Sequence, residues 1–288
     1  MIINFEKIYR RNLKYFISKI LQKIFLYLNL NAKTDIKVLF NKDIISANIF
    51  VNGVYEKDLL DFIIDLTGKF GSLKKQSVVD IGSNIGNHSL YFSKYFKTVY
   101  SFEAHPKIFS VSKLNFSEIK NIKPFNLGLG NTNKNSIIYE NQFNLGGSSV
   151  VNKVGKRIKI KLKKLDSIKN LKNLRLIKID VEDFELEVLK GSINTLKKFK
   201  PIVAFESWSN HNPKISLLKK LGYTIYIVDN FNPFNFIILK AIYNLKDIFI
   251  GRKFKLIEYS KDFDKRSFDQ LIAIPQSKVI NLTKKKGQ

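Results

Sequence analysis

Acidic residues follow four separate runs of apolar residues in this sequence. The acids are Asp80, Glu103, the neighbouring pair Asp180 and Glu182, and Glu206. If each run is a strand of one parallel sheet, the carboxyl ends of these strands meet at one edge, where such sheets bind ligands. Carboxylates accept hydrogen bonds from hydroxyl groups and can act as bases, so this edge is the predicted site of the chemistry.

The turn after the first run, Asp80 to Gly86, reads DIGSNIG. A dinucleotide site needs G-x-G-x-x-G, but Asn84 and Asn87 occupy the second and third glycine positions. A phosphate-binding loop would need Gly-Lys-Ser/Thr, which is also missing. Glu103, at the end of the next strand, can accept hydrogen bonds from both hydroxyls of a ribose. The pattern therefore predicts a cofactor with a ribose and no phosphate, which points to S-adenosylmethionine.

Strands and helices alternate from about residue 77 onward, which predicts an α/β fold with a mainly parallel sheet and helices on both faces. The predicted strands of the sheet are 78–81, 98–102, 122–127, 174–180, 202–206, 223–228 and 270–274. The predicted helices are 87–95, 106–115, 184–197 and 213–221. A hairpin is expected from 136–139 and 157–162, around a loop rich in Asn, Gly and Ser.

An amphipathic helix is predicted over residues 5–30, within an N-terminal helical extension covering 1–47. This helix either packs on the main domain, 48–288, or lies on an anionic membrane surface. The apolar segment 231–262 interrupts the alternation and is expected to be an insertion, either a buried flap or a lid. No signal peptide or membrane-spanning stretch is recognised, so a cytoplasmic protein is expected, with peripheral contact to the inner face of the membrane as an alternative.

The composition contains no cysteine, and its three histidines, His88, His105 and His211, lack ligand spacing, so no metal site is expected. The formal charge is +26, yet only six of the 50 basic residues are Arg. Nucleic-acid readers use Arg for bidentate contacts, so this balance argues against nucleic acid as a partner. A Lys-rich solvated surface and attraction to anionic lipid or polysaccharide remain the two other interpretations.

Several motifs together resemble the FkbM-type methyltransferases. They are Val79–His88 (VDIGSNIGNH), Ser101–Glu103 (SFE) and Ile177–Gly191 (IKIDVEDFELEVLKG), with shorter matches at Gly53–Glu56 and Pro201–Glu206. The resemblance implies a class I, Rossmann-like methyltransferase fold, usually with a seven-stranded sheet whose last strand is antiparallel. It also implies S-adenosylmethionine as cofactor and O-methylation of a hydroxyl, often on a sugar or a natural product.

The resemblance also implies roles for individual residues. Around the methionine part of the cofactor it places Asp80, Gly82, Asn84 and Gly86. It assigns the ribose to Glu103 and the border of the adenine to Asn126 and Leu127. Asp180 and Glu182 would face the methyl group and the acceptor. Three positions depart from the family pattern: Ser83 replaces Ala, Ala104 replaces Pro, and Asp183 replaces Gly.

The base that would take the acceptor's proton is left open between Asp180 and Glu182, with Glu206 and His211 as further candidates. Each has a structural alternative: Asp180 could hold the cofactor amine, and Glu206 could cap the following helix. His88 is expected to pack, and Glu56 either reaches the cofactor's methionine end or is a surface charge.

The predicted function is O-methylation, by S-adenosylmethionine, of a hydroxyl on a sugar of a surface glycan or glycolipid. An RNA methyltransferase is the first rival, but such enzymes often carry Asn/Asp-Pro-Pro-aromatic where this chain has Asp180 to Asp183, and carboxylates there repel phosphate. The second rival is a non-catalytic cofactor-binding protein that acts as an assembly or membrane partner.

Overall fold

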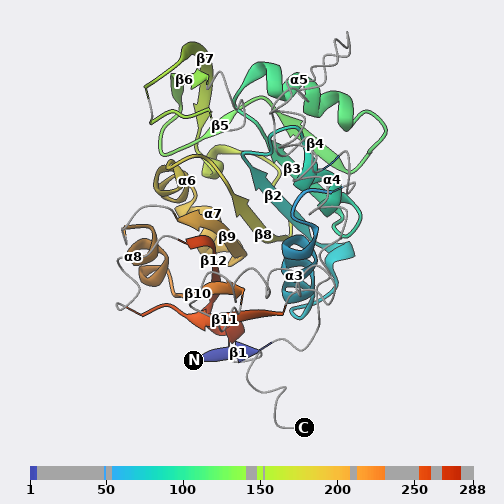
Figure 1. Cartoon of the computed structure of the whole chain (residues 1–288), viewed down its shortest axis with the longest axis vertical. Coiled ribbons are helices and arrows are strands. Elements are labelled where there is room, and N and C mark those ends of the chain that lie inside the picture. Colours follow the sequence, from blue (N-terminus) through green and yellow to red (C-terminus); the bar gives the residue numbers. More distant parts are fainter. Residues whose placement is uncertain are drawn as a thin grey trace, which may run out of the picture. The chain divides into compact units, whose positions relative to one another are not determined.

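The computed structural model describes residues 1–4, 49, 54–140, 148–151, 153–207, 213–230, 253–260 and 268–279 (Figure 1). Contacts divide the chain into a larger unit, Met1–Ile2, Ile64–Val228 and Leu256–Gln288, and a smaller unit, Ile3–Ile63 and Asp229–Lys255. The predicted helix over 5–30 and most of the predicted insertion lie outside the described residues. The proposed boundary at residue 47 therefore stays a prediction.

The larger sheet has nine strands in the order β1-β11-β10-β12-β9-β8-β2-β3-β4. In that order they are Ile2–Asn4, Phe254–Glu258, Tyr223–Asn230, Phe268–Pro275, Ile202–Ser207, Leu174–Ile179, Ser77–Ile81, Thr98–Phe102 and Ile122–Phe125. Neighbouring strands from β9 to β4 are parallel, whereas β12 is antiparallel to both β9 and β10. The sheet is therefore mixed.

The expectation of a seven-stranded sheet is wrong, although all seven predicted strands form. The two additional strands are β1, at the N-terminus, and β11, inside the segment interpreted as an insertion. β1 has only three residues, too few for a recognisable pattern. In β11, buried positions alternate with more exposed ones, Phe254 and Leu256 being buried. That pattern was hidden by the strongly apolar sequence before it.

Helices cover both faces of the central strands, as the apolar character of those strands predicts. β2 is buried along its whole length. Its alternate residues Val79 and Ile81 join a core with α6 (Glu185–Lys190), α7 (Ile193–Phe199) and α8 (Pro213–Lys220). Figure 1 shows these three helices on one side of the sheet and α4 (Asn87–Ser93) and α5 (Pro106–Asn115) on the other.

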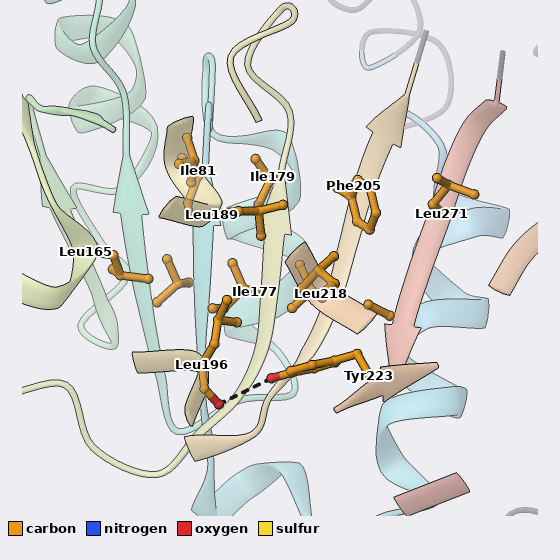
Figure 2. Close-up of a cluster of buried hydrophobic side chains, with 14 of the residues drawn as sticks. Ile81, Leu165, Ile177, Ile179, Leu189, Leu196, Phe205, Leu218, Tyr223 and Leu271 are labelled. Carbon is orange, nitrogen blue, oxygen red and sulfur yellow. Dashed lines mark hydrogen bonds between the residues drawn. The ribbon is translucent and has the colours of Figure 1, made fainter. Parts of the chain in front are cut away.

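Figure 2 shows the core on the side of α6, α7 and α8. Ile177 and Ile179 of β8 and Phe205 of β9 contribute fully buried side chains to this cluster. The Tyr223 hydroxyl donates a hydrogen bond to the Leu196 carbonyl at 3.4 Å, so the one polar atom of this buried ring has a partner. This core fixes the strands whose carboxyl ends form the predicted site.

The single helix predicted over 184–197 is two helices, α6 and α7, which meet at Gly191 and Ser192. A Cβ atom at Gly191 would lie 1.9 Å from the Gly130 carbonyl oxygen. The absence of a side chain therefore lets the chain pass directly against the Gly130 backbone, and the helix changes direction there. Further helices are α3, Lys57–Gly68, and the 3₁₀ turns η1, Leu73–Lys75, and η3, Leu165–Ser167. Among the described residues no helix has the length and apolar character needed to cross a membrane.

A second sheet follows β4 and has the order β5-β7-β6. Its strands are Gly128–Leu129, Lys156–Lys163 and Lys134–Glu140, so the predicted hairpin forms, while the strand predicted over 122–127 ends at 125. Ile138, Ile160 and Leu162 form a small core that packs against Ala104 and Phe184. Because Ala104 follows β3 and Phe184 follows β8, this sheet lies at the carboxyl ends of the large sheet (Figure 1).

Candidate active site

The glycine turn passes very close to the end of β8. Gly82 has a φ of +76° and Gly86 a φ of +95°, both in the left-handed region. A Cβ atom at Gly82 would lie 1.8 Å from the Asp180 carbonyl oxygen, and one at Gly86 would lie 2.3 Å from the Phe116 ring. A side chain at either glycine would therefore displace the turn. With glycine at both positions, the backbone of the turn can face a ligand at the carboxyl edge of the sheet.

Glu103 binds this turn through its carboxylate. Its Oε2 accepts a hydrogen bond from the backbone N–H of Asn84 at 2.9 Å, and its Oε1 accepts one from the backbone N–H of His105 at 2.8 Å. Burial of the carboxyl raises the pKa of Glu103 to about 7, although both amide bonds oppose the shift. Each carboxylate oxygen can accept a second hydrogen bond. Glu103 can therefore hold a ribose diol while it fixes Asn84, which fits the predicted cofactor.

Asp80 lies beneath the turn, and its carboxylate is fully buried. Its Oδ2 accepts a hydrogen bond from the Ser89 hydroxyl of α4 at 2.6 Å. Its Oδ1 has no hydrogen bond within the described chain, but it lies 3.5 Å from the Lys178 ammonium. Asp80 therefore joins β2, α4 and β8 from inside, and contributes its charge to the site from below the turn.

Lys178 lies within the β8 motif, but no role was predicted for it. Its ammonium lies 3.1 Å from Asp180 Oδ2, 3.4 Å from the Gly82 carbonyl oxygen and 3.5 Å from Asp80 Oδ1. Desolvation lowers the pKa of this lysine, but the charges of Asp180 and Asp80 outweigh it, so the pKa lies above its ordinary value. The signal was a lysine inside an otherwise apolar parallel strand, opposite Asp80 in register.

The acids after β8 are more accessible than those on the cofactor side. The Asp180 side chain keeps 39% of its surface exposed, and Glu182 and Asp183 are exposed. Glu182 has a φ of +38° and Asp183 a φ of +68°, so the chain turns through two left-handed residues that are not glycine. Partial burial and the charges of Asp180, Asp183 and Glu185 together raise the pKa of Glu182.

Asn126 acts on the backbone around Glu103. Its side-chain amide donates hydrogen bonds to the carbonyl oxygens of Glu103 at 2.9 Å and Ala104 at 3.2 Å. Asn126 therefore ties the end of β4 to the end of β3, beside the position expected for the adenine. Next to it the buried His105 ring places Nε2 3.0 Å from Glu140 Oε2 of β6, and burial lowers the pKa of His105. This link joins the two sheets, and no local sequence pattern predicts it.

The other candidates are placed as follows. Glu206, at the end of β9, is half-buried, and its charge helps to raise the pKa of Lys178. His211 lies outside the described residues. His88 lies on α4, and Glu56 precedes α3 in the smaller unit. Within the described part of the chain, no three His, Cys, Asp or Glu side chains are arranged to hold a metal ion.

The Lys178 ammonium therefore connects Asp80, Gly82 and Asp180, and the glycine turn continues to Asn84, which binds Glu103. Gly86 closes the turn, Asn126 supports Glu103, and Glu182 follows Asp180 on the outer side. The buried half offers backbone amides and the Glu103 carboxylate, and the outer half offers accessible acids.

Comparisons with known proteins place the chain in a family. The sequence model of the methyltransferase FkbM domain matches residues 80–225. No curated protein sequence matches significantly. The chain is similar to the solved structure of methyltransferase FkbM from Methylobacillus flagellatus KT, with 17% identity and a TM-score of 0.40. The match covers 64% of this chain and 44% of that one, so this chain spans less than half of that relative's length.

Two further solved structures are similar at comparable levels. An O-methyltransferase from Thermotoga maritima, described as SAM-dependent, shares 10% identity with a TM-score of 0.41, over 80% of this chain and 70% of that one. An rRNA methylase from Streptococcus thermophilus shares 11% identity with a TM-score of 0.41, over 77% and 100%. Because the FkbM domain match extends over just over half of the chain and contains every element of the site described above, this protein belongs to the FkbM family of S-adenosylmethionine-dependent methyltransferases.

Proposed function

We propose that this enzyme transfers the methyl group of S-adenosylmethionine to a hydroxyl on a sugar of a surface glycan or glycolipid. The observation that carries the proposal is the position of the accessible acids Asp180 and Glu182 at the carboxyl end of β8, beside the glycine turn; partial burial and neighbouring charges also raise the pKa of Glu182. A hydroxyl is a weak nucleophile until its proton is being removed, and a carboxylate whose pKa is raised is a stronger base.

The turn from Gly82 to Gly86 would hold the methionine part of the cofactor, and Glu103 would hold the ribose. Asn126 and Leu127 would border the adenine. S-adenosylmethionine supplies an electrophilic methyl group with a neutral thioether as its leaving group. What the protein must add is alignment and a base.

Glu182 is assigned the role of proton acceptor, and Asp180 the role of orienting the acceptor hydroxyl. These different roles are assigned from the charged groups that lie beside each carboxylate. Lys178 lies 3.1 Å from Asp180 Oδ2, so that carboxylate is held in place by an ammonium group. Glu182 instead has three acidic neighbours, Asp180, Asp183 and Glu185, whose charges favour its taking up a proton.

A sugar acceptor is favoured over RNA by the charge at this end of the site. Asp180, Glu182 and Asp183 are consecutive or nearly so, and their carboxylates would repel a phosphate backbone. The same carboxylates are good acceptors for the hydroxyl groups of a sugar ring. Acids at the carboxyl ends of β2, β3, β8 and β9 are all present, which argues against the non-catalytic rival.

The test is incubation of the purified enzyme with methyl-labelled S-adenosylmethionine and separate glycan, lipid and RNA fractions. We expect label in the glycan or glycolipid fraction, in an ether that survives mild alkali, as a sugar O-methyl group does and a methyl ester does not. Label confined to RNA would overturn the proposal in favour of the first rival. Tight cofactor binding with no label in any fraction would favour the second.

A further inference from the structure

An open groove of about 880 Å³ lies beside the second sheet; of the residues assigned to cofactor and base, its lining includes Asn126. Four of its lining residues are lysines: Lys134, Lys153, Lys159 and Lys161. None of the lining residues, all of which belong to the described chain, is acidic. The volume is in the range of small-molecule sites. The groove is therefore a concave site with a strongly positive wall.

The strand geometry places two of these lysines on one face. Lys159 and Lys161 are two residues apart in β7, so their side chains leave the same side of the strand. Their antiparallel partners in β6 are Ile137 and Asn135, which also line the groove. Paired residues share a face, so an apolar contact and an amide hydrogen-bonding group lie beside the two ammonium groups.

The acidic residue of β6 and β7, Glu140, binds residues other than the groove lysines. Glu140, at the end of β6, is buried, and its Oε2 lies 3.0 Å from His105 Nε2 and 3.8 Å from the Lys107 ammonium. Its charge is therefore directed at His105 and Lys107. The groove lysines keep their positive charge for a ligand, and a lysine cluster in a concave site is a common way to bind phosphate.

The groove adjoins both halves of the active site. Asn126, which is predicted to border the adenine, is part of its lining, and so is Ala104, whose carbonyl oxygen accepts a hydrogen bond from Asn126. Val150 also lines it, and the preceding residue, Ser149, donates a hydrogen bond to the carbonyl oxygen of Glu182 at 3.2 Å. Val150, which a ligand in the groove would contact, is therefore the sequence neighbour of a residue that is hydrogen-bonded to the loop carrying the proposed base.

We propose that this groove binds a phosphate or diphosphate group carried by the sugar acceptor, and so selects phosphorylated sugars. The inference rests on the proposed function. It follows from the opposite charges of the two neighbouring regions: acids at the Glu182 end suit a neutral polyol, and lysines in the groove suit an anion. A nucleic acid is anionic along its whole length, so it would meet the acids as well as the lysines.

The test uses inorganic pyrophosphate as the probe, titrated calorimetrically into the full chain saturated with S-adenosylhomocysteine. The groove variant is K134Q/K159Q/K161Q. The control variant is K169Q/K197Q/K220Q, which removes the same charge from exposed lysines elsewhere in the larger unit. We expect the groove variant to bind pyrophosphate about tenfold more weakly or worse, and the control to stay within about twofold of the wild type.

Three results would overturn the inference. Absence of pyrophosphate binding is the first, and equal weakening in both variants, which would mean a general charge effect, is the second. The third is displacement of S-adenosylhomocysteine by pyrophosphate, because the groove would then belong to the cofactor. Label transfer to a glycan fraction without pyrophosphate binding would remove this inference and leave the proposed function intact, so the two failures are distinguishable.

Two further titrations identify the carrier of the phosphate. One uses uridine diphosphate glucose, and the other uses phosphatidylcholine vesicles that contain a polyprenyl diphosphate. Tighter binding of the first than of pyrophosphate, lost in the groove variant, supports a nucleotide-linked sugar. Vesicle binding lost in the groove variant and kept in the control supports a lipid-linked one. Either result supports the groove as the phosphate site.

Discussion

The two ends of the active site hold their carboxylates in different ways. On the cofactor side, Asp80 and Glu103 are buried and bound to hydroxyl, amide or ammonium groups of neighbouring elements. On the acceptor side, Glu182 and Asp183 are exposed, on backbone in the left-handed region. The first arrangement is rigid because core strands fix it. The second leaves carboxylates accessible for a substrate. A constant cofactor and a variable acceptor would produce this division.

Lys178 is the residue on which the cofactor side depends most. Its replacement by methionine, K178M, keeps the length of the side chain but leaves the fully buried Asp80 without its cation. Removing one partner of a buried pair costs about 3–5 kcal/mol, so we expect the free energy of unfolding to fall by about that amount in urea denaturation.

The matched control is K190M, which breaks the exposed pair between Lys190 and Glu187 on α6. Exposed pairs contribute less than about 1 kcal/mol, so this variant should be nearly as stable as the wild type. Equal losses in K178M and K190M would show that the Lys178 cluster does not stabilise the fold.

Among the acidic side chains of the site, substitution of Glu182 should reduce turnover most and change cofactor binding least. We expect E182Q to lower kcat by about 100-fold with the labelled glycan acceptor, because a general base contributes about that much or more. The Kd for S-adenosylmethionine should stay within about twofold, since Glu182 lies outside the buried half. E187Q, at a half-buried position of α6 whose carboxylate pairs with Lys190, is the control with the same chemical change.

D180N separates orientation from proton removal. It should reduce kcat and also disturb Lys178, so it should lower stability more than E182Q does. If D180N and E182Q both kept full turnover, the assignment of these acids to the acceptor would be wrong.

The smallest effect is expected from substitution of Asp183, on the acceptor side. Its φ of +68° explains why glycine is usual at this position of the family motif. D183G should therefore raise the free energy of unfolding by about 1 kcal/mol, because glycine adopts this conformation without strain. It also removes one of the charges that raise the pKa of Glu182. The ionised base then persists to lower pH, so the acidic limb of the kcat profile should move to lower pH.

K200G is the control for this pair of effects. Lys200 also has a left-handed φ, +45°, at the end of α7. This variant should gain similar stability and leave the pH profile unchanged. A pH shift of the same size in K200G would contradict the role given to Asp183.

The seven central strands and the glycine turn could be predicted from the sequence because their signals are local. Val78 to Ile81 is apolar except for Asp80, and the turn after it contains glycines that local backbone geometry demands. The break at Gly191 could not be predicted, because it depends on contact with Gly130, about sixty residues away in sequence. β11 was missed because its alternation extends over only five residues and lies within a segment that is otherwise rich in apolar residues.

The site was predicted in the same uneven way. Acids at strand ends were recognisable, so Asp80, Glu103 and Asp180 were named and the structure brings them together. Lys178 was missed because a lysine in a strand is normally a surface residue, and only the register of β2 against β8 shows that it faces Asp80. Asn126 was assigned to the border of the adenine, which stays a prediction; its hydrogen bonds to the backbone carbonyls of Glu103 and Ala104 could not be predicted, because they depend on how β3 and β4 lie side by side.

The affinity for S-adenosylmethionine as a function of pH tests the cofactor side most directly. Since the pKa of Glu103 is about 7, its carboxyl is mostly protonated at about pH 6 and mostly ionised at about pH 8. Ribose hydroxyls donate to the ionised form, so the association constant should rise about tenfold over this interval. E103Q should bind more weakly and lose this rise. A wild-type affinity that does not change with pH, or an equal rise in E103Q, would contradict the assignment of the ribose to Glu103.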